Sequence, residues 1–149
     1  MSKLKLLLLM MCLMCHFTVC AKGLDEQKLE KGLAMKISVT SNDDIMVFEL
    51  NDSEAAKSFY RQLPMDIAVE DYGGIEKIFY PSQKLNTTNT PLVKSANIGT
   101  LAYYAPWGNV VFFYGSFDSA SGLYELGFAV SGKEYIKNIS GTVQVQKYE

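Results

Sequence analysis

One stretch of the chain gathers most of the side chains that could bind a ligand. Residues 103–114 contain two tyrosines, the sole tryptophan, Trp107, and the run Phe112-Phe113-Tyr114. Aromatic rings combine a large contact area with a polar edge and often form the walls of ligand sites. Because alternate strand residues point to opposite faces, about half of these rings should instead fill a core. We therefore name Tyr104, Trp107 and Phe113 as candidate ligand contacts, with core filling as the alternative.

The side chains that most enzymes use are missing from the chain after residue 20. The single histidine and the three cysteines all precede residue 21. Their absence excludes a Ser-His-Asp triad, a thiol nucleophile and the usual zinc sites from the rest of the chain. Asp43-Asp44 and Glu70-Asp71 are adjacent pairs rather than a spaced calcium loop. We expect no catalytic residue, no metal site and no cofactor.

Glu76 and Lys77 stand together at the expected start of a strand. They could form a functional ion pair. The alternative is an ordinary surface pair, which contributes a fraction of a kcal/mol.

Length and charge place the chain in a broad class. Its 149 residues suit one domain, and 48% of them are hydrophobic, which argues against a largely disordered chain. The formal charge is -2 and the isoelectric point is near 5.4. A basic nucleic-acid-binding protein is therefore excluded.

The first 21 residues have the layout of a secretory signal peptide. Lys3 and Lys5 precede an apolar stretch, and Ala21 offers an A-x-A-like cleavage site. The apolar stretch is short for a membrane span. We predict a signal peptide over 1–21, a loose leader over 22–32 and an exported protein, periplasmic or secreted, without a membrane span. The alternative is a lipoprotein anchored through Cys20.

Hydrophobic alternation indicates eight short strands in the remaining body. They are expected at 33–39, 45–50, 65–70, 75–80, 101–104, 110–114, 124–130 and around 143–145. An apolar stripe predicts a helix that Asn51 caps with Glu54 and that ends near Leu63, and a second helix is expected over 132–138. The segment 82–97 is a long loop, which is either functional or a cover over one end of the fold. The fold is mainly β, a sandwich or a closed barrel.

Three runs of residues resemble the cyclophilin-like domain proteins of bacteria. They are Asp71-Tyr72-Gly73-Gly74-Ile75-Glu76-Lys77, Tyr103-Tyr104-Ala105-Pro106-Trp107-Gly108-Asn109 and Phe112-Phe113-Tyr114. The similarity covers about residues 35–146. It implies a closed eight-stranded cyclophilin-like β-barrel, residues 33–149, with a short helix capping each end.

A more distant similarity connects the chain to true cyclophilins, which are peptidyl-prolyl isomerases. It places Phe113 on their proline-pocket phenylalanine. Their catalytic arginine lies in a Phe-His-Arg run, where this chain has Ile78-Phe79-Tyr80-Pro81, and their pocket tryptophan and histidine have no match in 115–123. Tyr80 joins the candidate ligand contacts. The sole arginine, Arg61, falls late in the first helix and is expected to face solvent.

These features lead to three hypotheses about function. The first is a non-catalytic module that binds a peptide or a small apolar ligand at the barrel mouth, through Trp107, Tyr104 and the loop 82–97. The second is a divergent peptidyl-prolyl isomerase. The third is an accessory subunit of an envelope complex, docked through an apolar patch on the outer strands. The sequence predicts no oligomeric state.

Overall fold

The computed structural model describes residues 34–149. The predicted signal peptide 1–21, cleavage after Ala21, lipidation at Cys20 and the leader 22–32 lie outside the described residues. Within 34–149, neither helix is long and apolar enough to cross a membrane.

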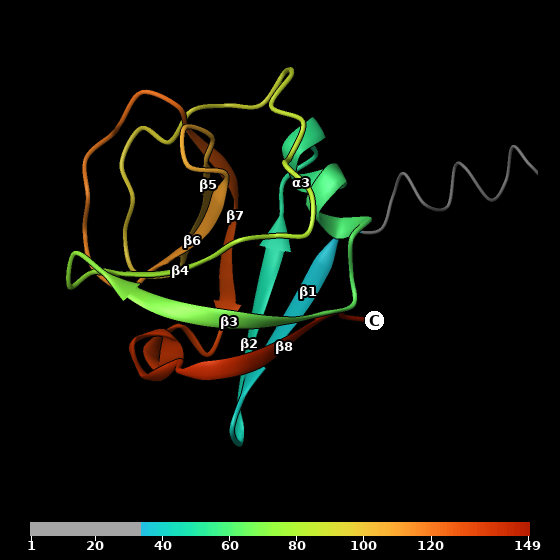
Figure 1. Ribbon diagram of the computed structural model, residues 1–149, viewed down its shortest axis with the longest axis vertical. Coiled ribbons are helices and arrows are strands. Elements are labelled where there is room, and N and C mark those ends of the chain that lie inside the picture. Colours follow the sequence, from blue (N-terminus) through green and yellow to red (C-terminus); the bar gives the residue numbers. More distant parts are fainter. Residues whose placement is uncertain (1–33) are drawn as a thin grey trace, which may run out of the picture. The chain divides into compact units, whose positions relative to one another are not determined.

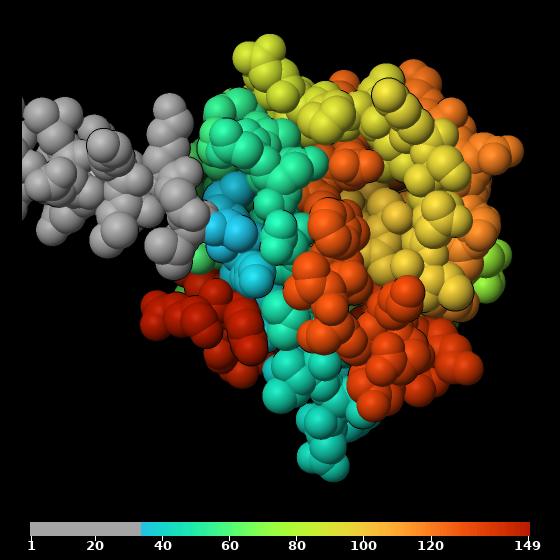
Figure 2. All heavy atoms as spheres, turned by 180° about the vertical axis from the view of Figure 1, so that it is seen from behind, coloured from blue at the N-terminus to red at the C-terminus, as the bar shows by residue number. Residues whose placement is uncertain are grey.

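Eight antiparallel strands close into a barrel in the order β1-β2-β7-β5-β6-β4-β3-β8 (Figure 1). The predicted strands are all present, and the closed barrel settles the choice between a sandwich and a barrel. Their bounds are β1 Lys36–Ser41, β2 Asp44–Leu50, β3 Met65–Tyr72, β4 Glu76–Phe79, β5 Thr100–Tyr104, β6 Asn109–Phe113, β7 Leu123–Ser131 and β8 Gly141–Lys147. The hairpin of β1 and β2 protrudes beyond the rest of the molecule in both views (Figures 1 and 2).

The barrel interior is filled by one set of alternating apolar side chains. On β6, Val110 and Phe112 point inward and are fully buried. The Phe112 ring packs against Phe48 and Phe79, with centroids 5.2 and 5.3 Å away. Closing the sheet removes its edges and gives every inward residue partners on several strands.

Strand β7 passes very close to β2 at Gly127, which is paired with Leu50. A Cβ atom at Gly127 would collide with the carbonyl oxygen of Glu49 and lie 2.9 Å from the Cα atom of Leu50. Glycine is required here because any side chain would push the two backbones apart.

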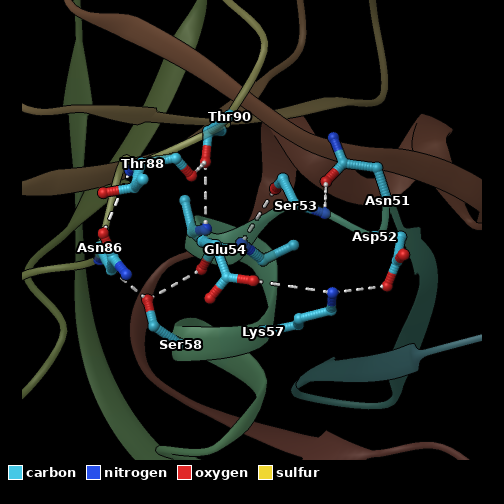
Figure 3. A network of polar contacts seen from close by, with 11 residues as sticks. Asn51, Asp52, Ser53, Glu54, Lys57, Ser58, Asn86, Thr88 and Thr90 are labelled. Atoms are coloured by element: carbon cyan, nitrogen blue, oxygen red, sulfur yellow. Dashed lines mark hydrogen bonds and ion pairs between the residues drawn. The ribbon is translucent and has the colours of Figure 1, made fainter.

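The first helix, α3, runs over Glu54–Tyr60 and begins two residues later than we predicted (Figure 3). Its N-cap is Ser53, whose Oγ accepts a hydrogen bond from the Ala56 amide at 3.2 Å. Asn51, the predicted cap, instead accepts from the Ser53 amide and donates to the Glu125 carbonyl. Asn51 therefore fastens the approach to the helix onto β7.

Helix α3 also ends earlier than Leu63. The Leu63 amide donates to the Tyr60 carbonyl, which is the tighter spacing of a turn. Proline at position 64 disfavours helical backbone in the residue before it, so the last residues before it leave the α-helix.

The loop 82–97 is held against α3 and β7. Thr90 Oγ1 accepts from the Ala55 amide, and Ser58 Oγ accepts from the Asn86 amide, as Figure 3 shows. Further along, the Val93 amide donates to the Leu123 carbonyl. In Figure 2 this yellow segment lies beside the orange-red strand β7.

The second helix, η1, is a 3₁₀ helix over Lys133–Asn138, close to its predicted bounds. It follows Gly132, whose φ of 73° is readily adopted only by glycine. Ile136 and Ile139 pack into the barrel core, and η1 and α3 lie on opposite sides of the barrel (Figure 1).

Candidate functional site

The outer face of the barrel carries a second buried apolar cluster, separate from the interior. On β6, Val111 and Phe113 point outward, opposite to Phe112. The loops 91–97 and 115–122 cover this face through Val93, Ala96, Phe117 and Ala120. The cluster consists of Ile78, Val93, Ala96, Ala102, Val111, Phe113 and Leu123, with Tyr104, Phe117 and Ala120 partly buried against it.

A cavity of about 280 Å³ lies on this outer face. We refer to it as the outer-face cavity. Ligand sites usually have volumes of about 300–1,000 Å³, so this cavity suits a small group rather than a large molecule. It is lined by Tyr72, Glu76, Tyr104, Trp107, Asn109, Val111, Phe113, Phe117, Ala120 and Leu123.

Strand register explains why these residues meet. Tyr72 is paired with Glu76, and Glu76 with Phe113, which forms one outward row across β3, β4 and β6. Asn109 is paired with Tyr104, and Tyr104 with Leu123, which forms a second row across β6, β5 and β7. Directly paired residues share a face of the sheet. The two rows border the cavity, with Val111 between them on β6.

Trp107 stands at the edge of the cavity between two tyrosines. It lies in the turn between β5 and β6, which the amide of Gly108 closes by donating to the Tyr104 carbonyl at 2.8 Å. Its ring makes edge-on contacts with Tyr72, at 5.2 Å and 89°, and with Tyr104, at 5.5 Å and 75°. The tryptophan is 49% exposed, so a ligand in the cavity can reach it.

Two polar groups in the wall, the Asn109 Oδ1 atom and the Glu76 carboxylate, form no hydrogen bond with residues 34–149. Asn109 is 2% exposed, and its Oδ1 accepts no hydrogen bond. Glu76 forms neither a hydrogen bond nor an ion pair there, and partial burial raises the pKa of its carboxyl group. A buried polar atom without a partner is unusual and points to a group that is satisfied by something else.

The structure brings together three of the four predicted ligand contacts. Tyr104, Trp107 and Phe113 line the cavity, whereas Tyr80 is 57% exposed and does not. Tyr80 directly follows Phe79, the last residue of β4, so it does not take part in the strand pairing that places side chains over the cavity.

We expected these residues to meet at the barrel mouth, whereas three of them line a cavity on the outer face. The rings that point inward, such as Tyr103 and Phe112, belong to the barrel core and do not line this cavity. The loop 82–97 contributes Val93 and Ala96 to the apolar cluster but no residue to the cavity wall.

Sequence reasoning missed Tyr72, Asn109 and Phe117 as lining residues. Asn109 could have been found from alternation, because it lies two and four residues before Val111 and Phe113 on one strand. Tyr72 and Phe117 reach the cavity only through strand pairing and loop placement, which one sequence does not reveal.

Glu76 and Lys77 do not pair with each other. Adjacent strand residues point to opposite faces, and Lys77 points away from the cavity with its side chain 5% exposed. Its Nζ donates to Asp71 Oδ2 at 2.8 Å, and the Tyr114 hydroxyl donates to Asp71 Oδ1 at 3.2 Å. The hydrogen bond from Lys77 holds the pKa of Asp71 below its usual value.

Arg61 is exposed at the end of α3, as predicted. It lines a different hollow, of about 380 Å³, with Ser58, Gln62 and the segment 82–84. In the described part of the chain, no three His, Cys, Asp or Glu side chains lie close enough to hold a metal ion.

Comparisons with known proteins agree with the fold. The model of the cyclophilin-like family matches residues 39–147. The solution structure of a hypothetical protein from Archaeoglobus fulgidus is similar, with a TM-score of 0.62 and 19% sequence identity over 78% of this chain and 97% of that one. At this identity the likeness concerns the fold alone. No curated protein matches the sequence.

Proposed function

The chain belongs to the cyclophilin-like family, and from that premise we propose that its outer-face cavity is a non-catalytic binding site for a peptide or another small, largely apolar ligand. The observation that carries the proposal is the meeting of Tyr104, Trp107 and Phe113 from β5, β6 and the turn between them around one open cavity. Concave, aromatic walls with few polar groups are typical of such sites.

The composition of the wall supports binding without catalysis. Prolyl isomerisation has a barrier of about 20 kcal/mol, and a donor to the prolyl nitrogen helps to lower it. Arg61 is the sole arginine of the chain and is not among the residues that line the cavity. Lysine is also absent from the described wall.

A divergent prolyl isomerase remains the second candidate, because one observation favours it. Phe113, which the resemblance places on the proline-pocket phenylalanine of cyclophilins, lines the outer-face cavity and is 1% exposed. A protease-coupled assay with proline peptides separates the two candidates. We expect the uncatalysed rate, and a rate above it would replace the binding module with an enzyme.

Binding can be followed through Trp107, whose ring borders the cavity. We expect peptides from a mixed pool to shift its fluorescence, and Phe113→Leu to weaken that response. Phe128→Leu is the matched control, since Phe128 is an exposed phenylalanine outside the cavity wall. No response to any peptide or small apolar compound, or equal responses from both variants, would refute the proposal.

A further inference from the structure

We propose that the outer-face cavity selects an alkylated ammonium group, which the rings of Tyr72, Tyr104 and Trp107 would surround beside the Glu76 carboxylate. The inference rests on the proposed function, because it specifies the ligand class of the same cavity. It depends on three features of the wall: its charge, its donor atoms and its rings.

The charge of the wall favours a cation. Glu76 is the single acidic residue among the lining residues, and no lysine or arginine stands with it in the described structure. The positive group nearest to it in sequence, Lys77, points to the other face and pairs with Asp71. An anion in the cavity would therefore face an uncompensated carboxylate.

A neutral ligand would desolvate the Glu76 carboxylate without compensating its charge. Any occupant removes water from the cavity, and a desolvated charge without a partner is strongly unfavourable. A positive ligand offsets this loss by direct attraction in a medium of reduced dielectric constant. The occupant that fits Glu76 thus carries a positive charge.

The donor atoms of the wall do not suit a metal ion. Calcium takes six to eight oxygen ligands, whereas the wall offers one carboxylate, the amide of Asn109 and the hydroxyls of Tyr72 and Tyr104 among rings and aliphatic groups. The Asn109 oxygen, which has no partner, is buried in the same wall and is a single neutral oxygen, so it adds little to a metal site.

The rings complete the preference for an alkylated ammonium. Trp107 meets both Tyr72 and Tyr104 edge-on, so its ring is steeply inclined to both tyrosine rings, and all three residues line the cavity. Aromatic faces attract cations, most strongly where water is excluded. A bare ammonium is strongly hydrated, while methyl groups spread the charge and fill apolar space.

The test compares a cation with its neutral isostere. Choline and 3,3-dimethylbutan-1-ol have the same shape and differ in the charged nitrogen. We expect choline to shift the Trp107 indole and Asn109 side-chain amide NMR signals of the purified protein. We expect the affinity for the alcohol to be lower by a factor of about ten or more. A peptide with trimethyllysine, beside the same peptide with leucine, tests whether the ammonium group comes from a peptide side chain.

Glu76→Gln tests the carboxylate without changing the size of the side chain. We expect it to weaken choline or trimethyllysine-peptide binding about tenfold and not to weaken the neutral isosteres, because a neutral occupant no longer desolvates a charge. Glu134→Gln, on η1 and outside the cavity wall, removes the same charge as a control.

The outcomes separate the inference from the proposed function. Equal binding of a cation and its neutral isostere would overturn the inference and support the binding site. Failure of both choline and the trimethyllysine peptide to bind would also overturn it, and the peptide-pool titration would then decide the proposed function alone. Unchanged binding in Glu76→Gln would overturn it as well.

Discussion

Phe112→Leu and Phe113→Leu change neighbouring residues of β6, and we expect different consequences from each. Both phenylalanines are buried, at 0% and 1% exposure. Phe112 points into the barrel and Phe113 toward the outer-face cavity. Phe112→Leu should mainly lower the free energy of unfolding, whereas Phe113→Leu should mainly weaken ligand binding.

The ring contacts give the size of the difference. Leucine keeps most of the buried apolar area, so the loss of stability is dominated by aromatic pairs, each worth about 0.5–1.5 kcal/mol. Phe112 loses two pairs, with Phe48 and Phe79, which amounts to about 1–3 kcal/mol. Phe113 loses one pair, with Phe117 at 5.9 Å, which amounts to about 0.5–1.5 kcal/mol.

Urea unfolding followed by circular dichroism measures both losses. With an m-value of about 1–3 kcal/mol/M, a loss of about 2 kcal/mol lowers the midpoint by about 0.7–2 M. Ligand titrations of the folded variants complete the comparison. A larger stability loss in Phe113→Leu, or weaker binding in Phe112→Leu alone, would refute the assignment of the two faces of β6.

Three further predictions concern stability. Burial raises the pKa of Glu76 above its ordinary value of 4.5, so ionisation of the carboxyl group costs stability as pH rises from 4.5 through the raised pKa of the folded protein. Glu76→Gln should therefore unfold at higher urea than the wild type at pH about 7, and the difference should vanish well below pH 4.5. The hydrogen bond from Lys77 lowers the pKa of Asp71, so its stabilisation is present above pH about 3.8 and is lost as pH falls through the lower folded value. Asp71→Asn should lower the melting temperature at neutral pH and flatten its decline in acid; an unchanged acid decline would show that the pair is unimportant. Gly127→Ala should prevent folding or lower stability by about 3 kcal/mol or more, since its Cβ collides with the β2 backbone, and a wild-type melting curve would contradict the β2–β7 register.

The strands could be predicted from sequence because their signal is local. Alternation in Ile37 and Val39, or in Val143 and Val145, reflects burial on one face, and all four side chains are buried in the barrel. The strand ends differ from the prediction, because pairing and not alternation sets them: β1 covers Lys36–Ser41 rather than 33–39, and β7 covers Leu123–Ser131 rather than 124–130.

The placement of the site depended on information that is not local. Phe112 and Phe113 look alike in sequence, and only barrel closure decides which of them faces the core. Glu76 and Lys77 looked like a pair because they are adjacent, yet the strand pleat separates them. Lys77 finds its partner, Asp71, through the β3–β4 register.

Capping depended on competition between equivalent polar groups. Asn51 and Ser53 are both good N-cap residues, and the local sequence does not choose between them. The choice follows from Glu125 on β7, whose carbonyl accepts from Asn51 and leaves Ser53 to cap the helix.

The two charged residues of β4 show how differently the two faces of one strand treat a charge. Lys77 is more deeply buried than Glu76, yet it lies against Asp71 and 5.7 Å from the centroid of the Tyr114 ring. Glu76 has no such partner within residues 34–149, and neither has the Asn109 oxygen in the same wall. An unsatisfied buried polar atom such as the Asn109 oxygen costs about 1–3 kcal/mol, and partial burial of the Glu76 carboxylate adds a desolvation cost. Apolar residues at both positions would remove these costs. A wall that retains these groups beside the exposed rings of Tyr72 and Trp107 and the partly buried ring of Tyr104 is therefore less stable than an apolar one would be. An occupant that supplies a positive charge would offset the desolvation of Glu76.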